Sequence, residues 1–175
     1  AACARTFKPF LMETSGNDPF LVMPSAPLAT AARGAAFAAY INCGQVCTSA
    51  ERFYVHTDIY DEFAERLIAE VSKLRVGDGL GKVDVGPMVN AREYERFEKI
   101  MAQAIEQGAR VACGGQRPEG KPNGYFYEPT VLLDVTPDMS IVNGECFGPV
   151  APLVRVDSFE EAMRLANASA RWRPT

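Results

Sequence analysis

The sequence predicts an α/β domain in which a mostly parallel β-sheet is flanked by helices, in a three-layer-like arrangement. Short runs rich in β-branched and aromatic residues alternate with longer segments whose apolar residues recur at helical spacing. Parallel strands need a crossover connection between them, usually a helix, and this alternation supplies it. No internal repeat, low-complexity stretch or flexible linker interrupts the 175 residues, so we expect a single domain.

The first part of the chain predicts two strands with a helix between them. The apolar run at residues 19–23 is short and bounded by turn residues, as buried strands are. Residues 28–40 are rich in alanine and contain one glycine, which favours a closely packed helix. The sequence NCGQVC at 42–47 breaks the helical pattern. Residues 51–56 then alternate and carry aromatic and β-branched side chains, which indicates a second strand.

Two amphipathic helices are predicted in the middle of the chain. Apolar residues fall at helical spacing through residues 59–74, and Asp58 is placed to act as the N-cap. A second amphipathic segment covers residues 90–107, and Gly108 is expected to close it as a C-cap.

The last third of the chain returns to extended structure and ends in a helix. Ser158 is expected to cap that helix, with Glu161 three residues on completing a capping box. Extended segments are expected at residues 110–113, 125–135 and 151–156.

Composition and charge restrict the partners of the chain. A net charge of −4 and a pI of about 5.1 provide no electrostatic attraction to nucleic acid or to anionic membranes, and we expect neither as a partner. No apolar run approaches the roughly 20 residues of a membrane helix, and the first residues lack the apolar core of a secretory signal. The five cysteines, odd in number and irregularly spaced, are therefore expected to be free thiols of a cytoplasmic protein.

Cys47 and Glu13 are the candidate catalytic residues. Cys47 follows an apolar helix, and Gly44 just before it would allow close backbone approach to a reactive thiol. Its alternative is a buried structural cysteine, the commoner role of a free thiol. Glu13 stands between an apolar run and a Ser-Gly turn, where a carboxylate can act as a general base. Its alternative is a solvated loop residue.

Glu145 and Phe147 are the candidate cofactor contacts. A glutamate followed by an aromatic residue and a rigid Gly-Pro pair could hold the ribose and the ring of a cofactor. The alternative is a surface turn with a buried phenylalanine. No metal site is expected, because such sites are usually built from clustered Cys and His side chains. The one histidine of the chain, His56, lies inside a predicted strand.

Taken together, these motifs resemble the aldehyde dehydrogenase superfamily. Its members carry a glutamate in a Leu-Glu-Leu-Gly-Gly-like stretch and a nucleophilic cysteine 34 residues later in Gly-Gln-x-Cys, and Glu13 and Cys47 match in type and spacing. The family's Glu-x-Phe-Gly-Pro-Val motif matches residues 145–150. Residues 84–88 and 124–131 match further family stretches in the expected order.

The resemblance implies an oxidoreductase that converts an aldehyde to a carboxylic acid with NAD or NADP. Cys47 would attack the aldehyde and carry first a thiohemiacetal and then a thioester, and Glu13 would activate water to release the acid. Glu145 would hold the nicotinamide-side ribose, and Phe147 would pack near the nicotinamide. Two further residues fall where family members contact the cofactor, Glu93 and Arg96.

The resemblance also implies boundaries. Residues 1–175 would form a single partial catalytic domain, an incomplete version of the family's, with the dinucleotide-binding domain and the C-terminal oligomerisation segment absent. The full-length family member is expected to be a homo-oligomer. Residues 14–17 depart from the family's Leu-Gly-Gly-Lys, and residues 170–175 depart from its usual continuation. We expect the chain alone to bind the cofactor weakly and to have little dehydrogenase activity.

Three alternative functions follow from the same residues. The chain could be a truncated, non-catalytic remnant that binds partners without turnover. It could act as a cofactor-independent thioesterase or esterase through Cys47 and Glu13. Acyl transfer to coenzyme A is less favoured, because family members that use coenzyme A generally lack the water-activating glutamate.

Overall fold

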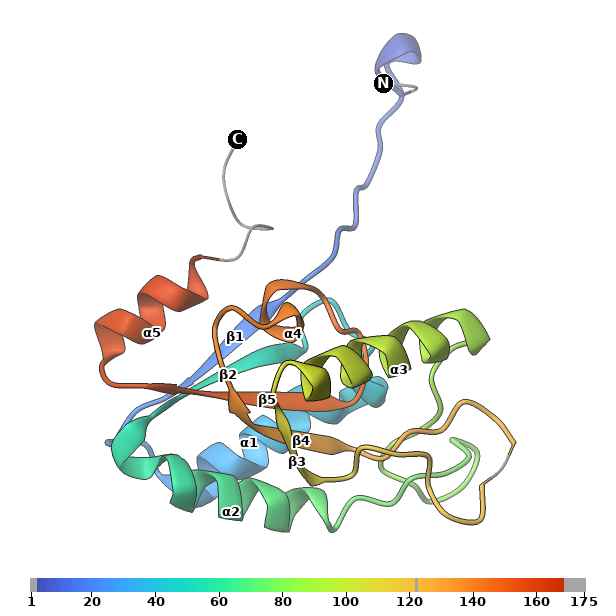
Figure 1. Cartoon of the computed structure of the whole chain (residues 1–175). Coiled ribbons are helices and arrows are strands. Elements are labelled where there is room, and N and C mark those ends of the chain that lie inside the picture. The colour runs from blue at the N-terminus through green and yellow to red at the C-terminus, as the bar shows by residue number, and fades with distance from the viewer. Residues whose placement is uncertain (1–2, 122, 169–175) are drawn as a thin grey trace.

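A five-stranded sheet lies between two layers of helices in the computed structural model, which describes residues 3–121 and 123–168 (Figure 1). The strand order is β1-β2-β5-β4-β3; the first four are parallel, and β3 runs antiparallel to β4 at the edge. The predicted mostly parallel α/β fold is therefore confirmed. The strands are β1 (Asp18–Val22), β2 (Ala50–His56), β3 (Arg110–Cys113), β4 (Thr130–Val135) and β5 (Val150–Val156).

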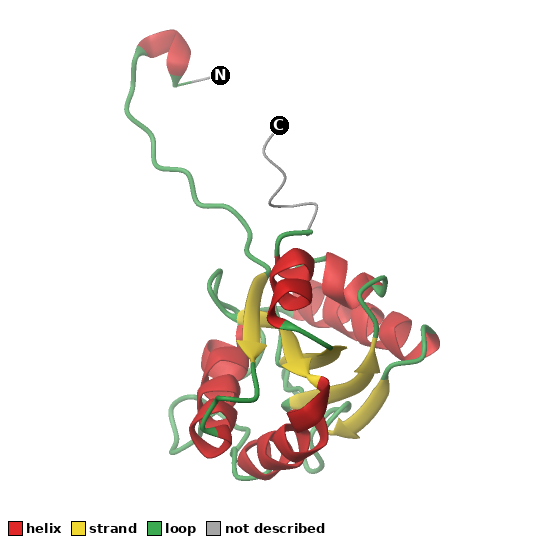
Figure 2. Cartoon of the chain, turned by 90° about the vertical axis from the view of Figure 1, so that its left-hand side faces the viewer, coloured by secondary structure: helices red, strands yellow, loops and turns green. Residues whose placement is uncertain are grey.

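The helices divide between the two faces of the sheet. Helices α1 and α2 pack against each other on one face, and α3, α4 and α5 lie on the other (Figures 1 and 2). The helices are α1 (Leu28–Tyr40), α2 (Tyr60–Val71), α3 (Ala91–Glu106), α4 (Ser140–Asn143) and α5 (Phe159–Ala166). Short 3-10 turns are η1 (Ala4–Thr6), η2 (Ile41–Gly44) and η3 (Thr57–Ile59). None of the helices in the described residues is both long and apolar enough to cross a membrane.

The core is centred on β2, whose residues are buried along nearly its whole length. Phe53 meets Phe20 of β1 with ring centroids 5.4 Å apart. Helix α2 adds Phe63 and Leu67, both fully buried. Helix α1 presents small side chains instead, which lets it lie close to α2 and to the sheet. Its buried alanines are Ala32, Ala35, Ala36 and Ala39.

A buried arginine joins the last helix to the start of the first strand. Arg52 of β2 is 1% exposed, and its guanidinium donates to the carbonyl of Asn17 through Nε (2.9 Å) and Nη2 (2.6 Å). Its Nη1 donates to the carbonyl of Ala166 at the end of α5 (3.1 Å). The carbonyl end of a helix carries partial negative charge, which favours a cation there. These bonds connect the loop before β1, β2 and α5.

Most predicted elements are confirmed, including several of the predicted helix ends. Helix α1 has the predicted bounds. Ser158 Oγ accepts from the backbone N–H of Glu161 (3.1 Å), which is the predicted cap of α5. Gly108 follows α3 with φ of +108°, a backbone conformation that only glycine adopts easily.

Two local predictions are wrong. Asp58 does not cap α2, because η3 is inserted between β2 and the helix; Asp58 donates its backbone N–H to His56 Nδ1 instead (3.2 Å). The extended segment predicted at 125–135 forms a strand only from Thr130, since Pro129 has no N–H to offer a ladder. The atypical tail at 170–175 lies outside the described residues.

The fully buried Leu67 gives a direct test of the α2 packing. We expect Leu67→Ala to lower the free energy of unfolding by about 2–5 kcal/mol, because it removes core contacts and leaves a cavity. Leu80→Ala is the matched control: Leu80 is 98% exposed, so its change should stay within about 0.5 kcal/mol. Urea unfolding measures both, and equal effects would contradict this packing.

Candidate active site

Three segments that are distant in sequence meet at one edge of the sheet because each leads into a parallel strand. Residues 13–17 lead into β1, residues 41–49 into β2, and residues 144–149 into β5. These strands are neighbours in the order β1-β2-β5 and are mutually parallel, so their amino ends lie side by side. The candidate catalytic residues Glu13 and Cys47 lie on two of these segments, and the candidate cofactor contacts Glu145 and Phe147 lie on the third.

A pocket of about 760 Å³ opens at this edge, and all the candidate catalytic and cofactor residues line it. It contains Cys47 and Glu13, and also Glu145 and Phe147. The structure therefore brings the four candidates together, while their chemical roles stay predictions. The remaining lining residues are Thr14, Ser15, Gln45, Val46, Glu93 and Arg96.

The loop that carries Cys47 begins with a left-handed turn. Asn42, Cys43 and Gly44 have φ of +50°, +61° and +71° in succession. A Cβ on Gly44 would lie 2.2 Å from the carbonyl oxygen of Gly148, so this glycine lets the loop contact the backbone before β5. Ser49 Oγ donates to the Gly44 carbonyl (3.2 Å) and closes the loop, whose tip leaves Cys47 exposed.

Gly16 joins the Glu13 segment to both other segments. A Cβ at this position would lie only 1.7 Å from the carbonyl oxygen of Cys47, so no side chain fits there without displacing the backbone. The Gly16 N–H donates to Glu145 Oε1 (3.0 Å). Glycine here therefore determines how closely Glu13, Cys47 and Glu145 can approach. Sequence reasoning did not single out Gly16, although its place in the glutamate motif was a signal.

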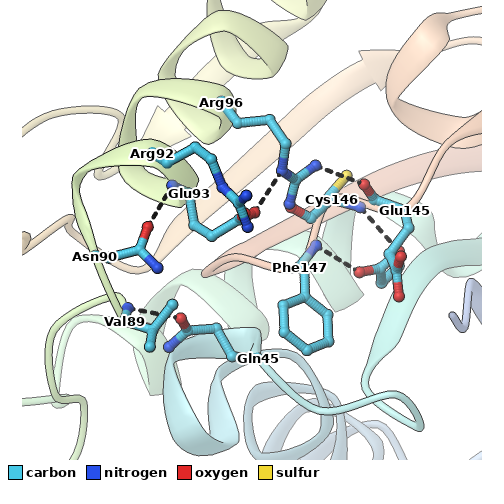
Figure 3. Close-up of polar contacts among 10 residues, drawn as sticks. Gln45, Val89, Asn90, Arg92, Glu93, Arg96, Glu145, Cys146 and Phe147 are labelled. Atoms are coloured by element: carbon cyan, nitrogen blue, oxygen red, sulfur yellow. Dashed lines mark hydrogen bonds and ion pairs between the residues drawn. The ribbon is translucent and has the colours of Figure 1, made fainter. Parts of the chain in front are cut away.

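Gln45 ties the nucleophile loop to the segment before α3. Its Oε1 accepts from the Val89 N–H (2.8 Å), and its Nε2 donates to the Asn42 carbonyl (3.1 Å). One residue further on, Asn90 Oδ1 accepts from the Glu93 N–H (3.0 Å) and caps α3 (Figure 3). The cap sets the first turn of α3 beside the pocket.

Arg96 of α3 holds the turn that carries Glu145. Its Nη1 donates to the Glu145 carbonyl (3.1 Å) and its Nη2 to the Cys146 carbonyl (2.7 Å). Its Nε donates to Glu93 Oε2 (2.8 Å), and this bond, aided by Arg92, lowers the pKa of the Glu93 carboxyl (Figure 3). Arg96 is thus engaged with the protein backbone as well as lining the pocket.

Glu51 is a buried carboxylate beside the same turn. Its Oε2 accepts from the Cys146 N–H (3.0 Å) and its Oε1 from the Phe147 N–H (2.7 Å). Burial raises the pKa of this carboxyl to about 7, although the two N–H bonds and Arg96 oppose the shift. Phe147 has φ of +49°, a conformation that costs a bulky residue roughly 1–2 kcal/mol. The bonds to Glu51 help to hold it there.

Glu51 was not found by sequence reasoning. An acidic residue beside Arg52 at the beginning of a strand is typical of an exposed strand end. The available signal was that its neighbours in the same strand pattern are apolar and aromatic.

The five cysteines are free and differ in exposure. Cys47 is exposed, whereas burial raises the pKa of the Cys43 thiol to about 12 and also raises the pKa values of Cys113 and Cys146. Those three thiols are therefore poor nucleophiles near neutral pH. Within residues 3–121 and 123–168, no group of three or more His, Cys, Asp or Glu side chains could hold a metal ion.

The chain belongs to the aldehyde dehydrogenase family: residues 1–171 match the family, and the resemblance drawn from the motifs is confirmed. The lactaldehyde dehydrogenase of Escherichia coli K12 is 43% identical over 171 residues, covering 97% of this chain and 35% of the relative. A succinate-semialdehyde dehydrogenase [NADP(+)] of Mycobacterium avium is 42% identical over 163 residues, covering 93% of this chain and 34% of the relative.

Solved structures of the family have the same fold. The betaine aldehyde dehydrogenase of Staphylococcus aureus in complex with NAD+ superimposes with a TM-score of 0.89 at 32% identity, covering 95% of this chain and 34% of that one. The chain therefore spans about a third of the length of the relatives it matches.

The contact between Gly16 and the Cys47 carbonyl can be tested by one added methyl group. We expect Gly16→Ala to destabilise the fold by about 1–3 kcal/mol, since the backbone must move to admit the Cβ. It should also change the alkylation rate of Cys47. Gly79→Ala is the matched control, because a Cβ there meets nothing within 4 Å. If both variants unfold at the same urea concentration, the contact does not restrict this site.

Proposed function

We propose that this chain carries the catalytic thiol of an NAD(P)-dependent aldehyde dehydrogenase, which oxidises an aldehyde to a carboxylic acid. The observation that carries the proposal is the pocket at the amino ends of β1, β2 and β5. There the exposed Cys47 shares one cavity with Glu13, Glu145 and Phe147. Family membership supports the same reading.

In the proposed reaction, the Cys47 thiolate attacks the carbonyl carbon of the aldehyde and forms a thiohemiacetal. The backbone N–H of Cys47 helps to hold the oxyanion. The carbon then loses a hydride, and Cys47 carries a thioester. Glu13 removes a proton from water, which attacks the thioester, expels the thiolate and releases the carboxylic acid. One aldehyde and one water thus yield one acid, one hydride and one proton.

The residues of the pocket fit a nicotinamide cofactor. Glu145 offers a half-buried carboxylate, a suitable acceptor for ribose hydroxyls, and Phe147 offers a half-buried ring that a nicotinamide could pack near. When bound, an oxidised nicotinamide would accept the hydride from the thiohemiacetal. NAD and NADP are both supported, since one relative is named for NADP(+) and a neighbouring structure holds NAD+.

Hydrolysis is favoured over transfer of the acyl group to coenzyme A, because Glu13 lines the same pocket as Cys47. The same two residues would also support cofactor-independent esterase activity, since both are exposed in an open pocket. That activity gives a direct assay of the site in this chain.

Selective labelling tests whether Cys47 is the working thiol. We expect a limiting alkylating reagent to modify Cys47 well before Cys43, Cys113 and Cys146, because burial raises the pKa values of those three thiols. Mass spectrometry of the native chain locates the adduct. Equal modification of all five thiols would instead favour the non-catalytic remnant.

The role of Glu13 can be separated from that of Cys47 with an activated ester such as p-nitrophenyl acetate. We expect Glu13→Gln to leave the rapid acylation phase in place and to slow release of the acyl group by about 10²–10⁴-fold, the range lost with a general base. Cys47→Ala should abolish both phases. Glu106→Gln, an exposed carboxylate outside the pocket, is the control. An unchanged release rate in Glu13→Gln would rule out the general-base role.

A further inference from the structure

The turn of residues 145–147 is gripped on its backbone from two sides. Arg96 from α3 donates to the carbonyls of Glu145 and Cys146, and Glu51 from β2 accepts the N–H groups of Cys146 and Phe147. Arg96 thus binds carbonyl groups of this short turn, and Glu51 binds N–H groups of the same turn. Figure 3 shows Arg96 reaching the turn from its own helix, with the Glu145 side chain and the Phe147 ring projecting away from the guanidinium.

We propose that Glu51 and Arg96 are positioning residues that together clamp this turn, and that protonation of Glu51 loosens the clamp. Neither acts on substrate in this role; they act through the positions of Glu145 and Phe147. The proposal rests on the cofactor role proposed above for those two residues.

The surroundings of Glu51 determine how its carboxyl divides between the neutral and the ionised form. Burial is the largest influence on this carboxyl and favours its neutral form. Glu145 also favours the neutral form, whereas Arg96 and the two N–H donors favour the ionised form. The Cys146 thiol is fully buried with a raised pKa, so it stays neutral. The balance leaves Glu51 with a pKa of about 7, within the range where enzymes commonly work.

Ionisation changes the number of bonds that Glu51 can accept. The carboxylate has two strong acceptor oxygens, one for each N–H, whereas protonation makes one of these oxygens an O–H group and a weaker acceptor. The turn is therefore fully held only above a pH of about 7. Phe147 has a left-handed backbone and Gly148 is wedged against the ring of Phe97, so local packing leaves few conformations in which the turn could find new partners.

The same ionisation opposes global stability. Because the pKa of Glu51 is raised above its usual value of 4.5, the native chain holds a proton that the unfolded chain has lost between about pH 4.5 and 7. The stabilising contribution of this group is complete below that window and is lost as the pH rises through about 7. The ordered turn and the most stable fold therefore require opposite protonation states of Glu51.

Amide NMR of the ¹⁵N-labelled chain tests the clamp directly. We expect the amide signals of Cys146 and Phe147 to titrate with a midpoint near pH 7, and Glu51→Gln to abolish that titration. Glu161→Gln is the matched control: Glu161 also accepts a backbone N–H, from Asp157 (2.8 Å), and lies on α5. Signals of residues 146 and 147 that do not move with pH in the unsubstituted chain would overturn the proposal.

Arg96→Gln provides a second variant in case Glu51→Gln does not fold. Arg96 stabilises the ionised form of Glu51, so its loss should raise the midpoint of the same two signals. An unchanged midpoint would contradict the paired clamp.

Nicotinamide riboside is the functional probe, because it carries only the ring and ribose that Phe147 and Glu145 would contact. One pH unit below the pKa only about a tenth of Glu51 is ionised, so affinity near pH 6 should be weaker by up to about tenfold than at high pH. Glu51→Gln should remove this pH dependence. If the amides of residues 146 and 147 titrate but the riboside does not bind, the cofactor role of Glu145 and Phe147 is rejected and the clamp stands. If the riboside binds but these amides do not titrate, the clamp is rejected.

Discussion

The geometry of the pocket depends on how closely three backbone segments approach one another. The Glu13 segment can lie against the Cys47 loop only because Gly16 has no Cβ where the Cys47 carbonyl stands. The same loop reaches the backbone before β5 through Gly44, against the Gly148 carbonyl. Gly148 in turn accommodates the ring of Phe97. The polar network of Gln45, Arg96 and Glu51 operates on segments that these glycines have already brought within hydrogen-bonding range.

The pocket also departs from the usual geometry of open α/β sheets, in which ligands bind outside the carboxyl ends of the strands. Here the three segments lie at the amino ends of β1, β2 and β5. Adjacent parallel strands align their amino ends as well as their carboxyl ends, so either edge can collect loops that are distant in sequence. Charged side chains line this pocket, and two of them, Glu93 and Arg96, come from the first turns of α3.

Much of the fold follows from periodicity, because helix and strand patterns reflect which face is buried. The bounds of α1 and the cap of α5 were predictable from local residues alone. The cap of α2 was not, since the inserted turn η3 depends on how β2 leads into that helix. The site is a different case. Local chemistry left Cys47 and Glu13 ambiguous, and only their spacing within a family pattern favoured them.

Glu51 shows why the rest of the site could not be predicted. Its two donors are some 95 residues away in sequence, and its burial depends on a turn that packs over β2 from another segment. From the local sequence alone, Glu51 and Arg52 would be predicted as a charged pair at the end of a strand. In the structure both are buried, and each forms hydrogen bonds with different backbone groups.

The buried arginine determines when the site can form during synthesis. Arg52 anchors the backbone of Asn17, next to Gly16, but it also needs the carbonyl of Ala166 at the end of α5. The last strand, β5, lies between β2 and β4, so the sheet stays in two parts until it arrives. Glu13 and Cys47 therefore leave the ribosome more than a hundred residues before β5, and over that interval they lack their final neighbours. The bonds that position the Glu13 segment, from Gly16 to Glu145 and from Arg52 to Asn17, are completed only when the last third of the chain has joined the sheet.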